Sequence, residues 1–397
     1  MEILDNKITI NSPIQPSLSL CMIVKNERQN LHRCLASIKP YVDEMIVVDT
    51  GSEDGTPEIA AQYGAKVSYF EWCDDFSAAR NYAISQASGN WILMPDADEE
   101  LVIESEDFLN QLTLRPHILA YSVALTEAND PSRTPAYLIR LLRNIPEIKY
   151  VGRFHEQPIY QNQYIQGNQI GYLEDIKILH YGYGKEQVLQ KNTTRNIPLL
   201  ERTRQEEGLS LMLLYCLAGM YTDTQQIEQA RECYTEAFDR LLQNLIDGTV
   251  PTEFSFVPSL IFILGTQSLQ QEDYEAVRLL CQRGLEWCPN YPPLNYLAGA
   301  AIRALGFPLG AVAYFENCLR LGREGNYYKG EPFEVSYMTT YPAYDLGCVY
   351  SELERPQEAL MAFELALSFD ANFTPAQEKA DKIRQNLATQ AERLRNV

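Results

Sequence analysis

Two aspartates separated by one residue, Asp96 and Asp98, are the residues whose spacing points most directly to chemistry. They follow the apolar run Trp91–Pro95, which is typical of a buried strand. Side chains two residues apart on a strand point to the same side, and ligands of open α/β sheets bind beyond the carboxyl ends of the strands. Two carboxylates at such a place suit a divalent cation, Mn²⁺ or Mg²⁺, that holds a diphosphate. Taken alone, an Asp-x-Asp is more often a polar exit from a strand into a turn.

The elements that would position this pair alternate between strand and helix patterns. Such alternation predicts a parallel sheet with right-handed helical crossovers. The predicted strands cover residues 18–24, 45–49, 66–70 and 91–95, and the predicted helices cover residues 27–39, 56–63 and 76–87. Polar clusters follow the strands, so one edge of the sheet collects the groups that would act on a ligand. Three further strand patterns, at residues 118–125, 137–142 and 176–180, are expected to extend the sheet on the acceptor side.

Four motifs occur in a fixed order between residues 18 and 100, namely Ser19–Glu27, Val47–Thr56, Phe76–Asn81 and Asp96–Glu99. Each motif is weak alone, but together they resemble those of the family 2 glycosyltransferases of the GT-A fold. The chain is especially similar to the bacterial branch in which tetratricopeptide repeats follow the catalytic domain. The resemblance implies an α/β GT-A domain, a nucleotide-sugar donor, a divalent metal held through the Asp-x-Asp, and inversion at the anomeric carbon.

The residue types support that chemistry independently, because a nucleotide diphosphate leaving group needs its developing charge neutralised. A divalent metal held mainly by Asp98 and assisted by Asp96 would act as the Lewis acid. Asp49, at the end of the second predicted strand, is placed for the nucleoside, and Arg80 is expected to reach the base or the phosphates. Many family members carry a second aspartate after the position of Asp49, whereas this chain has Thr50. The base of the donor is therefore left open between UDP, GDP and others.

Two later segments, Gly152–Glu156 and His180–Gly184, contain two of the four histidines of the chain. A lone histidine is more often structural than catalytic. Both segments, however, resemble recurrent motifs of this transferase branch, and the resemblance suggests that His180 completes the metal shell. An inverting mechanism also needs a base that takes the proton of the acceptor. We expect Glu156 to be that base, with His155 as the second candidate.

The C-terminal half is helical in composition and contains a repeat. Gly265 and Gly299 are one 34-residue tetratricopeptide period apart, and the longer step from Gly299 to Gly347 predicts an insertion of about 14 residues near residues 322–336. A degenerate first unit ends with Ala230, Tyr234 and Ala237, and a polar helix at residues 375–396 is expected to cap the stack. The prediction is therefore four repeat units and a capping helix. Stacked repeats of this kind offer a concave surface for an extended peptide. Bracing of the catalytic domain or dimerisation fits the repeats equally well.

Length and composition set the outer bounds. With 397 residues and 46% hydrophobic composition, the chain is expected to form two or three domains. We predict a polar leader at residues 1–17, a GT-A glycosyltransferase domain at 18–205 and a tetratricopeptide-repeat helical domain at 206–397. A formal net charge of −20 repels phosphate backbones, so nucleic acid is not an expected partner. Nine scattered cysteines indicate reduced thiols and a cytoplasmic location, and no apolar run reaches the roughly 18 residues of a transmembrane segment.

The string Val47–Ser52 also fits the signature of aspartic peptidases. That chemistry needs two aspartates that share one proton, so a second Asp-Thr-Gly or Asp-Ser-Gly must come from the same chain or from a dimer. None occurs elsewhere in this sequence. The flanking helical patterns also disfavour the nearly all-β peptidase fold.

Three functions remain. The leading one is a metal-dependent inverting glycosyltransferase that moves a sugar to an acceptor, such as a peptide or protein held by the repeats. The second is a tetratricopeptide scaffold with an inactive transferase domain, which intact Asp96, Asp98, Arg80 and His180 disfavour. The third is a nucleotidyltransferase, which would show a glycine-rich phosphate loop after the first strand, where this chain has Lys25-Asn26-Glu27.

Overall fold

The structure is a computed structural model in which residues 17–105, 107–165, 167–182 and 184–395 are described. Contacts divide the chain into two compact units. The first unit runs up to Asn129 and continues over Tyr137–Gly184, and the second comprises Asp130–Ala136 and the chain from Lys185 onward. The predicted boundary at residues 205/206 falls inside the second unit. The predicted leader lies outside the described residues except for its last residue.

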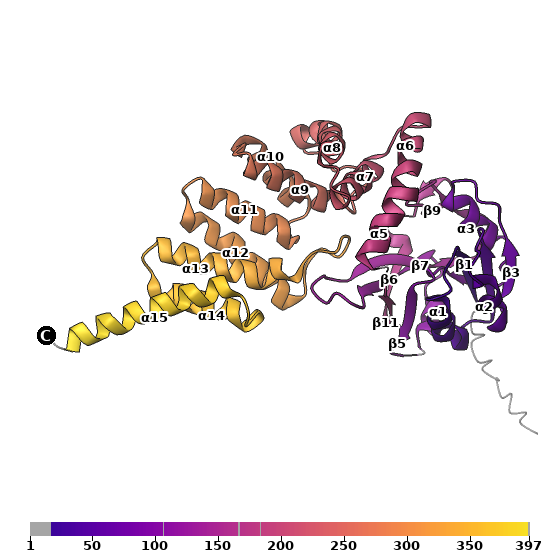
Figure 1. The fold of residues 1–397 in the computed structure, drawn as a ribbon, viewed down its shortest axis with the longest axis horizontal. Coiled ribbons are helices and arrows are strands. Elements are labelled where there is room, and N and C mark those ends of the chain that lie inside the picture. The colour runs from indigo at the N-terminus through magenta and orange to yellow at the C-terminus, as the bar shows by residue number, and fades with distance from the viewer. Residues whose placement is uncertain (1–16, 106, 166, 183, 396–397) are drawn as a thin grey trace, which may run out of the picture. The chain divides into compact units, whose positions relative to one another are not determined.

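The first unit is built on an eight-stranded sheet with the strand order β3-β2-β1-β4-β7-β6-β11-β5 (Figure 1). Its strands are β1 (Leu18–Val24), β2 (Glu44–Asp49), β3 (Lys66–Tyr69), β4 (Trp91–Leu93), β5 (Glu99–Ile103), β6 (Ala120–Glu127), β7 (Ala136–Arg143) and β11 (Ile170–His180). Strands β1 to β4 are parallel, as predicted. The later strands extend this sheet as expected and make it mixed, because β7 is antiparallel to β4 and β5 is antiparallel to β11, whereas β11 is parallel to β6. Strands β6 and β7 are joined by only residues 128–135, too few for the crossover that parallel strands need.

Helices cover both faces of the sheet. Side chains alternate along β1, and each of its two faces packs in a separate core. Leu20 and Met22 pack in one core with α1 (Leu31–Ile38), whereas Cys21 packs in a second core with α3 (Phe76–Ile84). A strand buried on both faces is apolar throughout, which is why the run at residues 18–24 predicts β1 correctly. The other helices of this unit are α2 (Thr56–Gln62) and α4 (Phe108–Leu114).

A small antiparallel sheet, which the sequence did not predict, follows β7. It consists of β8 (Ile148–Val151), β9 (Gln157–Tyr160) and β10 (Gln163–Tyr164) in the order β10-β9-β8. The loop between β8 and β9 contains Gly152 and His155, whose φ angles are +104° and +55°. These left-handed residues turn the chain sharply, so the segment Gly152–Glu156 forms a compact loop.

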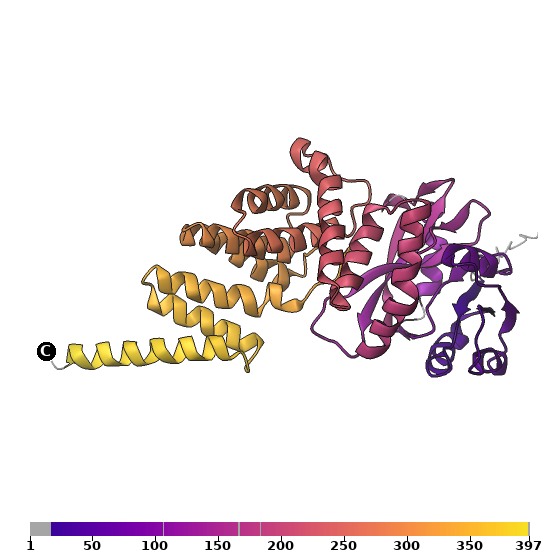
Figure 2. The ribbon, with the colours of Figure 1, turned by 45° about the horizontal axis from the view of Figure 1, so that its top comes forward.

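The second unit is helical, and antiparallel helix pairs follow one another along the chain (Figure 2). The first helices are α5 (Lys185–Lys191) and α6 (Ile197–Glu206), and the paired helices are α7 (Leu211–Asp223) with α8 (Ile227–Asp247), α9 (Val257–Gln270) with α10 (Tyr274–Trp287), α11 (Pro292–Ala304) with α12 (Pro308–Glu324), and α13 (Thr340–Glu352) with α14 (Pro356–Phe369). The last helix is α15 (Thr374–Arg395). Four helix pairs and a last helix thus lie where the four repeat units and the capping helix were predicted. Across the described residues, none of the helices is both long and apolar enough to cross a membrane.

The predicted insertion lies between α12 and α13, at residues 325–339, and contains a short helix at Val335–Met338. Tyr337 in this insertion contacts the rings of Phe262 on α9, Tyr296 on α11 and Tyr341 on α13. The insertion therefore lies against the first helices of three successive pairs. Part of the surface that these helices share is covered by the chain's own segment.

Residues Asp130–Ala136 belong to the second unit because they are hydrogen-bonded to this insertion. The backbone N–H of Thr134 donates to the carbonyl of Phe333 at 2.8 Å, and the N–H of Val335 donates to the carbonyl of Ser132 at 2.7 Å. Backbone bonds of this kind fix a segment whatever its side chains are, so a sequence pattern does not reveal them.

Candidate active site

Asp96 and Asp98 lie in a turn between β4 and β5, not on a strand. Strand β4 ends at Leu93 and β5 begins at Glu99. The expectation that both side chains point to one side of a single strand is therefore wrong. Instead the turn sends Asp96 toward two arginines and Asp98 toward His180, and the two carboxylates have different surroundings.

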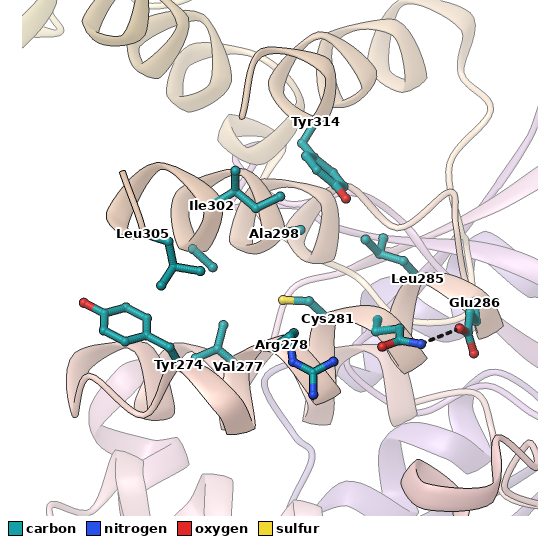
Figure 3. Close-up of a pocket in the computed structure, with 12 residues that line it drawn as sticks. Tyr274, Val277, Arg278, Cys281, Leu285, Glu286, Ala298, Ile302, Leu305 and Tyr314 are labelled. Carbon is teal, nitrogen blue, oxygen red and sulfur yellow. Dashed lines mark hydrogen bonds between the residues drawn. The ribbon is translucent and has the colours of Figure 1, made fainter. Parts of the chain in front are cut away.

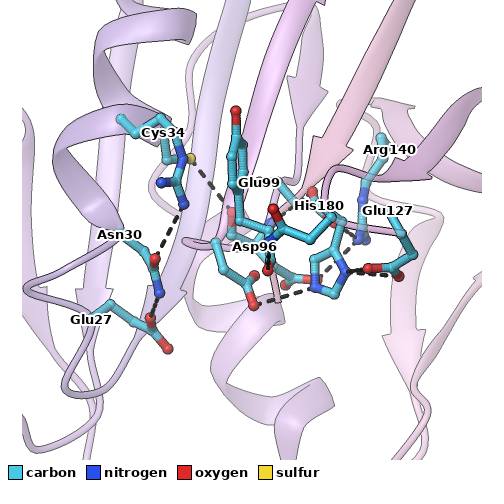
Figure 4. A network of polar contacts seen from close by, with 12 residues as sticks. Glu27, Asn30, Cys34, Asp96, Glu99, Glu127, Arg140 and His180 are labelled. Atoms are coloured by element: carbon cyan, nitrogen blue, oxygen red, sulfur yellow. Dashed lines mark hydrogen bonds and ion pairs between the residues drawn. The ribbon is translucent and has the colours of Figure 1, made fainter. Parts of the chain in front are cut away.

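His180 lies between two carboxylates at the end of β11 (Figure 4). Its Nε2 is 3.3 Å from Oδ2 of Asp98, and its Nδ1 is 3.0 Å from both carboxylate oxygens of Glu127. The strand register explains this grouping, because His180 pairs with Glu127 of β6 on one side and with Glu99 of β5 on the other. Burial lowers the pKa of His180, but the hydrogen bonds and charges of Asp98 and Glu127 outweigh it and raise the pKa to about 9.

The donors at His180 fit a divalent cation, although they do not make a complete site. Asp98 offers a carboxylate oxygen and His180 an imidazole nitrogen, both of which Mn²⁺ accepts. A carboxylate on the other ring nitrogen, as Glu127 provides, is the usual partner that orients a metal-bound histidine. Among the described residues, no group of three or more His, Cys, Asp or Glu side chains is arranged for a metal ion. A cation here would take its remaining oxygens from a diphosphate and water, as Mg²⁺ commonly does.

Asp96 lies between two arginines. Nη2 of Arg80 donates to Oδ1 of Asp96 at 3.0 Å, and Nη2 of Arg140 donates to Oδ2 at 2.9 Å. Desolvation raises the pKa of Asp96, but the charges of Arg140 and Arg80 outweigh it and hold the pKa well below its usual range. Both oxygens of Asp96 are thus used by arginines, and in this arrangement Asp96 anchors the guanidinium groups. Its predicted role as a metal ligand stays a prediction.

Each arginine also binds a second carboxylate, so the five charged groups form one row. Nε of Arg80 donates to Glu156, and Nη2 of Arg140 donates to Glu99. The arginine side chains are only 9% and 11% exposed, whereas that of Asp96 is 43% exposed. The centre of the row is therefore open to solvent while its cations are buried.

Two buried nitrogens of this row have no hydrogen-bond partner in the part of the chain that the structure describes, Nη1 of Arg80 and Nε of Arg140. An unpaired buried donor costs free energy, so such atoms commonly mark a place where a ligand or water completes the bonding. Arginine is well suited to phosphate oxygens because its planar group makes several charge-assisted hydrogen bonds. Arg80 was predicted to bind the donor, whereas Arg140 was not among the predicted site residues.

Asp49 lies at the end of β2 and holds the turn that follows. Its Oδ1 accepts hydrogen bonds from the backbone N–H groups of Gly51 at 2.9 Å and Ser52 at 3.0 Å. Gly51 has a φ of +106°, which favours glycine. The other oxygen, Oδ2, is buried and has no partner within the described residues, so it is available to a ligand. Thr50 is used structurally, because its hydroxyl donates to the carbonyl of Val24 at 3.1 Å.

Glu156 and His155 lie in the loop between β8 and β9. Glu156 is brought to the arginine row by its ion pair with Arg80, and its side chain is 11% exposed. His155 is exposed, and its ring packs near that of Phe154. The structure thus places Glu156 with the other predicted residues and leaves the choice of base as a prediction.

Three residues of this site were missed by the sequence analysis. Arg140 is a cation within the apolar strand β7, Glu127 ends the apolar strand β6, and Glu99 directly follows the Asp-x-Asp. Glu99 is 1% exposed, and one of its oxygens accepts from the backbone N–H of Asp96 at 3.0 Å. Burial raises the pKa of Glu99 to about 7 although Arg140 opposes this. A charged residue in or at the end of an apolar strand is the signal that would have found them.

Family models match one segment in each half of the chain. Residues 19–167 match the family model described as glycosyl transferase family 2, and residues 343–373 match the model of a tetratricopeptide repeat. Residues 19–167 therefore form a family 2 glycosyltransferase domain. Together with the mixed sheet and the helix pairs, the matches confirm the predicted fold class of an α/β GT-A domain followed by an all-α tetratricopeptide-repeat domain.

Two relatives extend the comparison. A TPR repeat-containing protein of Synechococcus elongatus is 45% identical over 185 residues, which are 45% of this chain and 46% of the relative. The SPbeta prophage-derived glycosyltransferase SunS of Bacillus subtilis is 30% identical over 200 residues, which are 47% of this chain and 44% of the relative. The matched part spans less than half the length of each relative.

Solved structures are more distant. The crystal structure of glucosyl-3-phosphoglycerate synthase from Mycobacterium tuberculosis in complex with phosphoglyceric acid is 16% identical, and the match covers 47% of this chain and 80% of that chain with a TM-score of 0.34. A likeness at this score decides neither fold nor function.

Proposed function

We propose that the protein is a metal-dependent glycosyltransferase that moves a sugar from a nucleotide-diphosphate donor to an acceptor with inversion at the anomeric carbon. The observation that carries this proposal is the pairing of Asp98 with His180 beside a row of two buried arginines. These groups lie within, or directly after, a family 2 glycosyltransferase domain. Several relatives, SunS among them, are named as glycosyltransferases.

The donor would be bound mainly through its diphosphate and nucleoside. Asp98 and His180 would hold a divalent cation, which supplies a Lewis acid for the charge that develops on the leaving diphosphate. Arg80 and Arg140 would donate their unpaired nitrogens to phosphate oxygens. The free oxygen of Asp49 would accept a hydrogen bond from the nucleoside. Asp96 keeps both guanidinium groups in position, which avoids reorganisation when the charge develops.

Glu156 remains our first candidate for the base that takes the acceptor proton, and His155 is the second. The ion pair with Arg80 holds the carboxylate of Glu156 in place beside the arginine row. Its carboxylate would be free to contact the acceptor if the diphosphate drew Arg80 away from it.

A peptide or protein acceptor bound by the repeats also remains a proposal. The insertion at residues 325–339 lies against α9, α11 and α13 through Tyr337. An acceptor would therefore bind elsewhere on the repeats or replace this segment. The repeats' capacity for peptide binding follows from their architecture, and their architecture alone does not identify the peptide.

A screen of nucleotide sugars with Mn²⁺ or Mg²⁺, read as released nucleotide, tests the proposal. We expect the full chain to hydrolyse at least one donor slowly and only when the cation is present, and chelation with EDTA should stop the reaction. Asp98→Ala should abolish the signal, whereas Glu58→Gln, at an exposed position on α2, should leave it unchanged. If no donor is bound or cleaved with either cation, the alternative of a repeat scaffold with an inactive transferase domain replaces this proposal.

A further inference from the structure

A cavity of about 430 Å³ lies in the second unit between α10 and α11, with Tyr314 of α12 at one side (Figure 3). Much of its wall is formed by small and apolar side chains: Val277, Cys281, Leu285, Ala298 and Ile302. It opens at the surface, because Leu305 at its edge is 47% exposed. The proposed transferase reaction makes no use of this cavity.

The repeats themselves explain why the cavity is there. Phe315 follows Gly299, and Phe363 follows Gly347, at the same spacing, and each ring packs against the glycine of its own helix pair. Sixteen residues after the corresponding small residue of each pair (Ala218, Gly265, Gly299 and Gly347), the chain has an aromatic ring in three pairs and a thiol in one: Tyr234, Phe315, Phe363 and Cys281. The three rings are buried. The second pair is thus the one that lacks its ring.

The space of the missing ring is only partly refilled. A Cβ atom placed on Gly265 would meet Cδ2 of Leu297 at 2.5 Å, so a leucine of the next repeat covers the glycine that a ring would otherwise contact. Removing a large side chain from a packed array leaves a cavity where the neighbours collapse incompletely. The cavity beside Cys281 is therefore suited to an aromatic or other large apolar side chain.

The same chain carries exposed apolar side chains next to this cavity. Leu305, Phe307 and Leu309, in the turn between α11 and α12, are 47%, 66% and 66% exposed. Pro308 at the start of α12 restricts the backbone beside Phe307. Leu305 also lines the cavity, so the projecting side chains and the cavity form one continuous surface.

Charges on the rim of the cavity are arranged so that two copies would complement each other. Arg278, Gln282 and Glu286 lie one helical turn apart on the exposed face of α10. A two-fold axis near Gln282 would place Arg278 of each copy opposite Glu286 of the other. Their present partners within the chain, Glu275 and Arg283, form surface ion pairs, which contribute little and exchange readily.

We propose that this surface binds a second copy of the chain, with Phe307 of each copy entering the cavity of the other. Such an interface is isologous, since the same cavity and the same projecting side chain occur on both copies. A buried aromatic side chain in a pocket is the usual centre of an interface, and exposed charges at the rim set its register. The proposal concerns the repeats alone and does not depend on the transferase activity.

Sedimentation velocity of the full chain over a broad concentration range tests it. We expect a reversible dimer, and Phe307→Asp should raise its dissociation constant at least about tenfold, as the loss of a central interface residue does. Met361→Asp is the matched control, because Met361 on α14 is 69% exposed and lies outside the cavity. A chain that stays monomeric throughout, or a dimer that Phe307→Asp does not weaken, would overturn the proposal.

Charge reversal tests the two-fold arrangement. Arg278→Glu and Glu286→Arg should each weaken the dimer, because each places like charges opposite one another across the axis. The double variant restores opposite charges and should recover most of the affinity. A double variant as weak as the single ones would overturn the arrangement, and circular dichroism of each variant checks that the helices are intact.

Discussion

Nδ1 of His180 lies 3.0 Å from both carboxylate oxygens of Glu127, and the two residues are register partners on neighbouring strands β11 and β6. This contact leaves Nε2 directed toward Asp98. Glu127 therefore fixes the orientation of the ring and, under the proposed function, the nitrogen that would face a cation.

We expect Glu127→Gln to weaken cation binding about 10- to 100-fold, the usual effect of losing the outer partner of a metal-bound histidine. Calorimetric titration with Mn²⁺ measures this directly, and the cation concentration for half-maximal activity should shift by a similar factor. Glu174→Gln, at an exposed position on β11, is the control. Equal affinity of the Glu127 variant and the parent would return His180 to a structural role.

The two aspartates of the Asp-x-Asp should differ when each is replaced. Asp98→Ala should abolish both cation binding and activity, because Asp98 is proposed to hold the cation. Asp96→Asn should instead raise the KM for the donor roughly 10- to 100-fold, as expected for weakened charge-assisted hydrogen bonds to Arg80 and Arg140, with the cation affinity preserved. If Asp96→Asn lowers the cation affinity as much as Asp98→Ala, both aspartates are ligands.

Much of this architecture is predictable from the sequence, and the exceptions have physical causes. Strand β1 and the repeats follow from local patterns, an apolar run bounded by polar residues and a fixed period of glycines. The turn that carries Asp96 and Asp98 was expected to be a strand end, because the start of β5 at Glu99 is charged and does not show an apolar strand pattern. Contacts such as Asp96 with Arg140 join strands distant in sequence, and a single sequence does not record them.

A side chain added at a repeat glycine that faces a ring should destabilise the helical unit. A Cβ atom on Gly347 would meet the ring of Phe363 at 2.5 Å, so Gly347→Ala should lower the free energy of unfolding by about 1 to 3 kcal/mol, the usual cost of overpacking. Gly219→Ala is a matched control in α7, since nothing lies within 4 Å of its added Cβ. There alanine should stabilise the helix by roughly 0.5 to 1 kcal/mol. Chemical denaturation of the three proteins measures both effects, and equal stabilities would contradict the packing argument.

Glu331 in the insertion should make the stability of the helical unit depend on pH. Burial raises the pKa of Glu331 to about 7, against the opposing hydrogen bond from Tyr215 and the charge of Arg133. The folded unit therefore holds the proton more tightly than the unfolded chain. The resulting stability is fully present below the unfolded pKa of about 4.5 and is lost as the pH rises through about 7.

Glu331→Gln should abolish this contribution, because glutamine stays neutral. When the pH is lowered from about 8.5 to about 5.5, we expect the free energy of unfolding of the parent to rise by about 1 to 3 kcal/mol relative to that of the variant. Denaturation at each pH measures this difference. Glu334→Gln, an exposed position of the same insertion, should behave like the parent. Parallel pH profiles for Glu331→Gln and the parent would show that the carboxyl group is solvated.

Glu156 has two candidate roles that kinetics can separate. As the base, Glu156→Gln should lower kcat by about 10² or more with little change in the KM for the donor. As the anchor of Arg80, the same substitution should mainly raise the donor KM, because glutamine still accepts a hydrogen bond but carries no charge. Because Glu156 is paired with Arg80, we expect some change in the donor KM under both roles, so the size of the fall in kcat distinguishes them. His155→Ala is measured in parallel, and a loss of kcat there with an unaffected Glu156→Gln variant would transfer the base role to His155.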